Sequence, residues 1–341
     1  MKGFRFWLAT GGLLVAAWPG HAAADKFAGA FLEGGAGARA LGMGNAYTAI
    51  ADDASAVYWN PAGLAGTRHN ELLLAHEFRF GELVDFSYAA GVVQVRQRDG
   101  RLGFGIIRLG VDDIAFPDSS LWEDLDRDGD IDPGEFRYDA IRDADKIRFV
   151  NDAEYGFFLT YAQPKGAYQI GGSLKVIRQS VGEFSSFGLG VDVGVLRRGI
   201  WRDLDVGLAV HDLTGTYLSW STGRKETISP VPRLGLAYRV QSDGLRGSLL
   251  FASDVEMHFD DRRGADQLWT GPVSANLNWG VEFTMQNRLA LRLGLRESSF
   301  QAGAGFTAGP IQFDYGIVPD PIRNADFELS QRFSVRYVHL R

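Results

Sequence analysis

Hydrophobic and polar residues alternate with a period of two along most of the chain after residue 70. This alternation predicts β-strands with apolar side chains on one face and glycine or polar side chains on the other. The segment 187–195 is a clear case, with apolar residues at odd positions and glycine or aspartate at even ones. We count about 14 such segments, with approximate ranges 72–80, 86–92, 102–111, 155–161, 168–176, 187–195, 204–210, 234–240, 249–257, 279–283, 289–295, 301–308, 311–317 and 333–337.

The connections between the predicted strands alternate between short turns and long loops. Outer-membrane barrels show this alternation, with short periplasmic turns and longer outer loops. The sequence therefore predicts an all-β fold, a 14-stranded antiparallel transmembrane β-barrel over residues 71–341, surrounded by outer-membrane lipid. The long loops of this barrel are expected on one side, at 112–150, 214–231, 258–277 and 319–328.

A soluble secreted sandwich or propeller is the alternative fold. Its polar faces would meet water and carry many charges, whereas here those faces are rich in glycine, alanine, serine and threonine. Small side chains fit a packed lumen, so the barrel is the favoured interpretation. In a barrel the apolar face of each strand is expected to face lipid, including Phe86 and Tyr88 of segment 86–92.

Residues 1–24 have the features of an export signal peptide. Lys2 and Arg5 give a positive start, Phe6 to Trp18 is apolar, and Ala22 to Ala24 offers a cleavage site of small residues. An uncleaved anchor helix is the alternative, but the apolar run is shorter than the roughly 20 residues of a membrane span. We expect an exported protein of a Gram-negative-type outer membrane.

Residues 25–70 differ from the rest of the chain because they are rich in glycine and alanine and lack the strand alternation. We expect this segment to fold inside the barrel as an N-terminal plug, or hatch. The residues singled out for contact with a ligand or with the barrel interior are Phe31, Leu41, Met43, Asp52, Asp53, Trp59, Asn60 and Pro61.

Composition and charge narrow the choice of partners. The net charge is −7, which argues against nucleic acid because phosphates require a basic face. The chain has no cysteine, which excludes disulfides, thiolate nucleophiles and cysteine-based zinc sites. Its 43 glycines fit strands, tight turns and close backbone contacts.

A set of motifs in the N-terminal segment carries a family resemblance. The motifs are Gly37 to Gly44, Ala46 to Ala49, Asp52-Asp53-Ala54 and Asn60 to Leu64. They resemble the N-terminal region of PorV/PorQ proteins, within the FadL/TodX-like group of outer-membrane barrels. The resemblance implies a 14-stranded barrel whose N-terminal segment folds into the lumen.

The resemblance implies two possible functions. FadL-type members take up fatty acids and other hydrophobic molecules through a lateral opening, whereas PorV-type members receive exported proteins in type IX secretion. The segment before the barrel is shorter here than in the fatty-acid transporters, which favours the PorV/PorQ side. The main prediction is therefore a role in handling exported cargo with secretion-system proteins, and the alternative is uptake of a hydrophobic small molecule.

The sharpest local motif lies in the loop 112–150 and matches a 12-residue calcium loop. It has acidic residues at the ligand positions and Gly129 at the sharp turn, which is the pattern of an EF-hand loop. We expect a structural Ca²⁺ site that orders this loop, and the alternative is an acidic solvated loop. The candidate ligands are Asp124, Asp126, Asp128, Asp130, Asp132 and Glu135.

No set of residues in the sequence predicts catalysis. The histidines lack metal-site spacing and there is no GxSxG motif, so we expect that the protein is not an enzyme. Asp52 and Asp53 are expected to be structural, paired with lumenal arginines such as Arg233, Arg292 or Arg296. An outer-membrane enzyme is the weakest alternative, because it would require a catalytic cluster that the sequence does not show.

Overall fold

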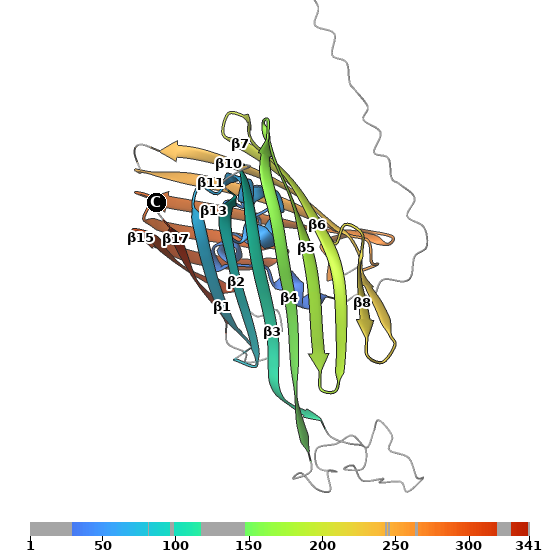
Figure 1. Cartoon of the computed structure of the whole chain (residues 1–341). Helices are drawn as coiled ribbons and strands as arrows, with labels where there is room; N and C mark the ends of the chain where they lie inside the picture. The colour runs from blue at the N-terminus through green and yellow to red at the C-terminus, as the bar shows by residue number, and fades with distance from the viewer. Residues whose placement is uncertain are drawn as a thin grey trace, which may run out of the picture.

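The computed structural model describes residues 29–80, 82–95, 99–116, 147–242, 244, 246–262, 265–318 and 329–339. Fourteen long strands follow one another around a single antiparallel sheet (Figure 1). Their bounds are β1 (Asn70–Arg79), β2 (Val84–Val95), β3 (Gly100–Phe116), β4 (Arg148–Lys165), β5 (Tyr168–Val181), β6 (Phe184–Trp201), β7 (Leu204–His211), β10 (Val231–Ser242), β11 (Gly247–His258), β13 (Val273–Met285), β14 (Leu289–Arg296), β15 (Ser299–Ala308), β16 (Ile311–Val318) and β17 (Ser330–His339).

The sheet closes on itself because the first and last strands pair. β1 and β17 form an antiparallel ladder from Asn70 opposite His339 to Phe78 opposite Gln331. Closure leaves no free edge at this seam and satisfies its backbone donors and acceptors. The predicted closed barrel of 14 antiparallel strands is therefore confirmed, and each predicted segment lies on one of the 14 strands, except that 72–80 extends one residue beyond β1.

Two of the predicted long loops contain additional strands. The connection 214–231 holds the hairpin of β8 (Thr216–Trp220) and β9 (Lys225–Ile228), and the connection 258–277 holds β12 (Leu268–Thr270). None of the helices in the described part of the chain is long and apolar enough to cross a membrane.

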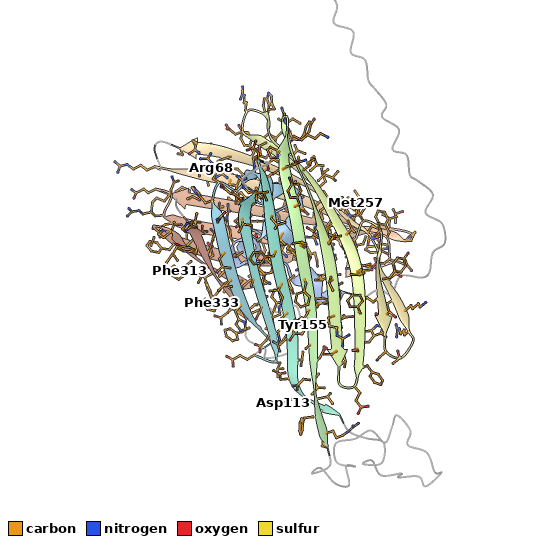
Figure 2. All side chains as sticks on the ribbon, in the orientation of Figure 1. Arg68, Asp113, Tyr155, Met257, Phe313 and Phe333 are labelled. Atoms are coloured by element: carbon orange, nitrogen blue, oxygen red, sulfur yellow. The ribbon has the colours of Figure 1, made fainter. Side chains whose placement is uncertain are left out.

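Large apolar side chains cover the outside of the barrel. Leu174 is 61% exposed and Leu293 is 69% exposed, on strands far apart around the ring. Figure 2 shows the side chains projecting from the wall, with Phe313 and Phe333 labelled. Both phenylalanines are about half exposed, at 49% and 48%. An exposed apolar surface of this extent favours contact with lipid.

The prediction that every apolar face points outward is wrong for β2. Phe86 and Tyr88 are 1% and 2% exposed and face the interior. Arg79 and Arg332 lie over the Phe86 ring, and the Tyr88 hydroxyl donates to the Ala54 carbonyl. The interior here is filled by protein, so aromatic residues can pack there as favourably as against lipid.

The residues 29–69, called here the N-terminal segment, lie inside the ring of strands (Figure 1). They form four short helices, η1 (Ala30–Gly34), α1 (Ala38–Gly42), α2 (Ala56–Trp59) and η2 (Pro61–Gly66). Glycines on the inner faces of several strands allow the close approach. A Cβ on Gly171, Gly207 or Gly294 would collide with backbone atoms of Pro61, Thr48 or Gly44.

Candidate binding pocket

The wall of the barrel has a break between β9 and β11. β6 pairs with β7 through residues 193–197 and with β8 through residues 186–189. β7 pairs with β10 from His211 opposite Val231, and β8 and β9 form a hairpin beyond the end of that ladder. The ladder of β10 and β11 begins at Arg233 opposite Glu256. No ladder among the described residues joins β9 to β11, so these two strands are not hydrogen-bonded to each other, whereas β10 joins β7 to β11 in the rest of the wall.

A buried ion cluster holds the chain where β7 ends. Lys175 Nζ lies 3.1 Å from Asp192 Oδ1 and 2.6 Å from Asp212 Oδ1. The Asp212 amide donates to Asp192 Oδ1 at 2.8 Å, and the Thr216 hydroxyl donates to Asp212. Asp212 has a φ of 52°, a left-handed conformation that aspartate tolerates better than most residues. The cluster therefore fixes the turn between β7 and β8, which both pair with β6.

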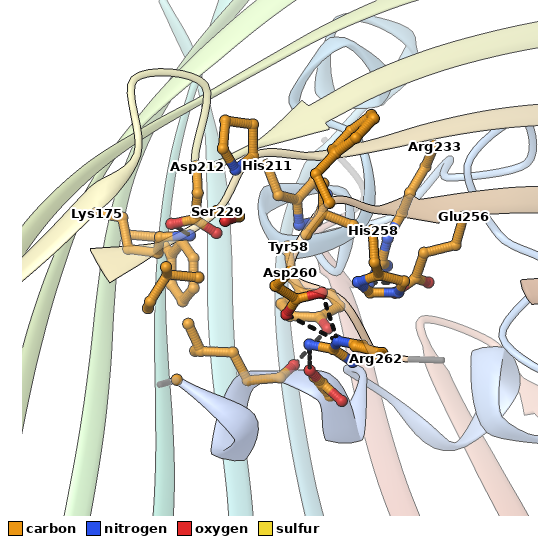
Figure 3. Close-up of a pocket in the computed structure, with 18 residues that line it drawn as sticks. Tyr58, Lys175, His211, Asp212, Ser229, Arg233, Glu256, His258, Asp260 and Arg262 are labelled. Atoms are coloured by element: carbon orange, nitrogen blue, oxygen red, sulfur yellow. Dashed lines mark hydrogen bonds and ion pairs between the residues drawn. The ribbon is translucent and has the colours of Figure 1, made fainter. Parts of the chain in front are cut away.

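A narrow pocket of about 50 Å³ lies beside this break (Figure 3). Part of its lining is apolar and comes from the N-terminal segment, from β4, from the linker between β9 and β10, and from the end of β11. These residues are Leu32, Tyr58, Phe158, Ile228, Pro230, Val231 and Phe259. A volume of this size holds on the order of four water-sized groups, which is enough for the head of a small molecule.

Most of the remaining pocket lining is charged, and the charges are paired. Arg233 Nη2 lies 3.1 Å from Glu256 Oε2. Arg262 lies 2.5 Å from Glu33 and 2.9 Å from Asp260, as the dashed lines in Figure 3 show. Glu33 belongs to η1 and Arg262 to the loop after β11, so this ion pair ties the outer loop to the N-terminal segment.

A second cavity of about 300 Å³ adjoins the pocket. The two share Glu33, Glu256, His258 and Arg262, and the second is lined further by the loop after β11 and the turn after β14. Its lining is almost entirely polar. The ion pair of Glu33 with Arg262 therefore stands between a polar outer cavity and a partly apolar pocket at the wall.

The predicted partners of the two aspartates are wrong. Asp52 lies 2.7 Å from Arg39, a residue of the N-terminal segment itself, and Asp53 accepts from the Ser55 amide and the Tyr47 hydroxyl. Burial alone would raise the pKa of Asp52, but the guanidinium groups of Arg39, Arg198 and Arg336 together outweigh burial and lower that pKa. The sequence could not show this pairing because helix α1 turns back toward Asp52 only in the folded segment.

The arginines expected to pair with these aspartates bind other acids. Arg292 lies 2.7 Å from Glu282 and 2.8 Å from Asp314, and Arg296 lies 3.6 Å from Glu297. Arg39 donates to both oxygens of Glu282, at 2.8 and 2.9 Å. The N-terminal segment is therefore joined to β13 by a bidentate ion pair.

The apolar residues predicted to line a ligand pocket lie elsewhere in the core. Phe31, Leu41, Met43 and Trp59 are at most 3% exposed, and none of them lines either cavity. Trp59 donates to the Ala36 carbonyl at 2.8 Å and packs edge-on against Tyr58 at 4.8 Å. Leu41 and Met43 lie against Gly316 and Gly280 on the inner face of the wall, and Leu32 and Tyr58 reach the pocket instead.

Asn60 and Pro61 begin helix η2. The Asn60 side chain accepts from the Ala62 amide at 3.1 Å and donates to the Thr48 carbonyl at 2.9 Å. Pro61 occupies the first helical position, where a missing N–H costs nothing. Both residues are structural contacts within the segment.

The predicted calcium ligands, from Asp124 to Glu135, lie outside the described residues. Within the part of the chain that the structure describes, no group of three or more histidine, aspartate or glutamate side chains could hold a metal ion. The pocket residues Lys175, Glu256 and His258 were missed at the sequence level. The available signal in the sequence was a charged residue at a lumen-facing position of a strand. Such a position does not show which residue the charge pairs with.

Comparisons with known proteins agree with the fold. The model of an uncharacterised protein family, UPF0164, matches residues 15–182, just under half of the chain. The search of the curated proteins gives no match.

Two solved structures are similar over most of their length. The toluene transporter TodX of Pseudomonas putida has a TM-score of 0.57 at 14% identity, covering 89% of this chain and 97% of its own. A TodX deltaS2S3 mutant, described as a monoaromatic hydrocarbon channel, has a TM-score of 0.58 at 11% identity, covering 89% and 98%. The chain therefore has the fold of the TodX type of β-barrel.

Proposed function

We propose that the protein is an outer-membrane channel for hydrophobic small molecules. The observation that carries the proposal is the pocket beside the wall break, where apolar side chains such as Ile228 and Phe259 meet the interior of the barrel. A gap in the ladder at this place offers a way between the interior and the lipid. The likeness to the toluene transporter supports the same class of function.

The outer surface supports a location in a membrane. Exposed leucines and phenylalanines surround the barrel, and a closed ladder satisfies the backbone without water. We propose a path from the polar outer cavity, past the ion pair of Glu33 and Arg262, to the pocket and the break. A small hydrophobic molecule would leave this path sideways between β9 and β11.

An uptake experiment tests the proposal. A Gram-negative host that expresses the protein is expected to take up a radiolabelled monoaromatic hydrocarbon faster than the host alone. Ile228→Trp should reduce uptake to near the host background, because the larger side chain fills a pocket of about 50 Å³. The matched control is Tyr217→Trp, since Tyr217 is 66% exposed on the same hairpin and lines neither cavity.

Two results would contradict the channel. One is uptake at the level of the host alone, with the protein present as a folded, heat-modifiable band. The other is uptake that Ile228→Trp leaves unchanged. Mass spectrometry of the mildly solubilised protein addresses the predicted role in secretion, because that role requires exported proteins in stoichiometric amounts.

The secretion role and the absence of catalysis stay predictions. The loop 112–150 suggested a surface for exported proteins, and its residues 117–146 lie outside the described part of the chain. The channel takes precedence over the secretion role because the pocket and the fold similarity both favour small molecules.

We also propose that the loop motif binds calcium. Asp124→Ala combined with Glu135→Ala is expected to abolish protection of the loop from protease by Ca²⁺, because both ends of the ligand set are removed. The comparison is with Asp203→Ala, which lies outside the motif at the turn after β6. Equal cleavage of the unmodified protein with and without Ca²⁺ would show that the motif is only an acidic loop.

A further inference from the structure

The cationic groups that line the pocket are all engaged by carboxylates. Lys175 contacts Asp192 and Asp212, Arg233 contacts Glu256, and Arg262 contacts Glu33 and Asp260. Among the described lining residues, these three cations face the four carboxylates of Glu33, Asp212, Glu256 and Asp260. The lining therefore carries no uncompensated positive charge.

This charge balance disfavours an anionic ligand. A carboxylate entering the pocket would lose its water and find each lining cation already bound to an acid. The nearby carboxylates of Glu256 and Asp260 would repel it, and the repulsion is strong where water is scarce. An uncharged head group avoids both costs.

Arg233 has a buried N–H in the pocket lining that has no acceptor. Arg233 uses Nη2 for Glu256, and its buried Nε makes no hydrogen bond although the side chain is only 8% exposed. His258, which is 3% exposed, has its Nε2 3.2 Å from Glu256 and is already paired with that carboxylate. Buried donors are normally satisfied, so a neutral oxygen acceptor is the chemistry that fits here.

We propose that the pocket selects uncharged molecules with an apolar body and one oxygen acceptor, such as an alcohol, ketone or ester, over anions such as fatty carboxylates. The head lies at Arg233, and the body lies along Ile228 and Phe259 and extends into the wall break. This inference rests on the proposed channel function and specifies its substrate class.

A matched pair of ligands tests the inference. Decanol and decanoate have the same chain, and decanoate is ionised at about pH 8. Each is titrated against an uncharged naphthylamine dye bound to the full-length protein in a nonionic detergent. Decanol is expected to displace the dye at a concentration about tenfold or more below that of decanoate, which corresponds to about 1.4 kcal/mol.

A charge substitution provides a second test, in which the binding of decanoate is expected to increase. Glu256→Gln removes one carboxylate and frees the charge of Arg233, so decanoate should bind about tenfold more tightly while decanol changes little. Glu183→Gln is the control, because it removes the same charge from an exposed pair with Arg148. If Glu256→Gln does not fold, Glu33→Gln combined with Asp260→Asn provides the same test, because the two changes remove both carboxylates that bind Arg262.

The outcomes distinguish a failure of the proposed substrate preference from a failure of the proposed channel function. Decanoate that binds the unmodified protein as tightly as decanol overturns the inference and leaves the channel standing. Failure of the dye and of both ligands to bind the folded protein overturns the channel as well. An unchanged preference in both the Glu256 and the Glu33 variants overturns the role assigned to the paired charges.

Discussion

Lys175→Ala is expected to destabilise the protein by about 3–5 kcal/mol, because it leaves two buried carboxylates without their cation. The side chains of Lys175 and Asp192 are each 2% exposed, so water cannot replace the lost partner. Urea unfolding in detergent, followed by tryptophan fluorescence, measures the change as a lower midpoint with a similar slope.

Two further variants identify the cause of this loss. Lys165→Ala removes an exposed lysine at the end of β4 and is expected to change stability little. The triple variant with Lys175→Met, Asp192→Asn and Asp212→Asn removes all three charges and should recover most of the loss. A loss of less than about 1 kcal/mol for Lys175→Ala, as for an exposed pair, would show that the cluster is not buried in solution.

Trp59→Ala is expected to cost about 3–5 kcal/mol in the N-terminal segment, because it removes a large side chain that is 1% exposed. The indole contacts Tyr58 and Tyr47 and donates to the Ala36 carbonyl, so the substitution leaves a cavity and an unpaired acceptor. The strands have their own ladders, so the closed barrel should persist.

Hydrogen exchange by mass spectrometry distinguishes the two parts of the molecule. Amides of residues 36–66 should lose protection in the Trp59 variant while those of the strands keep it. Trp201→Ala is the control, since Trp201 is 61% exposed at the end of β6. Unchanged protection of residues 36–66 would contradict the packing role of Trp59.

The residues of the candidate site could be predicted from the sequence less well than the strands. The alternation of segment 168–176 places Lys175 on the polar face of β5, but its partner Asp212 follows β7 and contacts it across the intervening strand β6. The connection 214–231 showed no feature of a wall break, because its two short strands pair with β6 and with each other. Contacts of this kind depend on the closed ring and have no local pattern.

β2 shows that the sequence also does not predict which face of a strand points into the barrel. Alternation places Phe86 and Tyr88 on one face and Ser87 and Ala89 on the other, and it does so correctly. It does not say which face is inside, because aromatic side chains are removed from water equally well by lipid and by a packed interior. The N-terminal segment decides the direction by contacting Tyr88.

The amino-acid sequence by itself determined the strands, their number and the all-β class, because the period of two follows from the backbone geometry of each strand alone. Only the tertiary structure decided the inward face of β2, the pairing of Asp52 with Arg39 and the pocket beside the wall break. Each of these depends on which segments meet inside the closed ring, and the physical reason is that burial and ion pairing act between residues far apart in the chain.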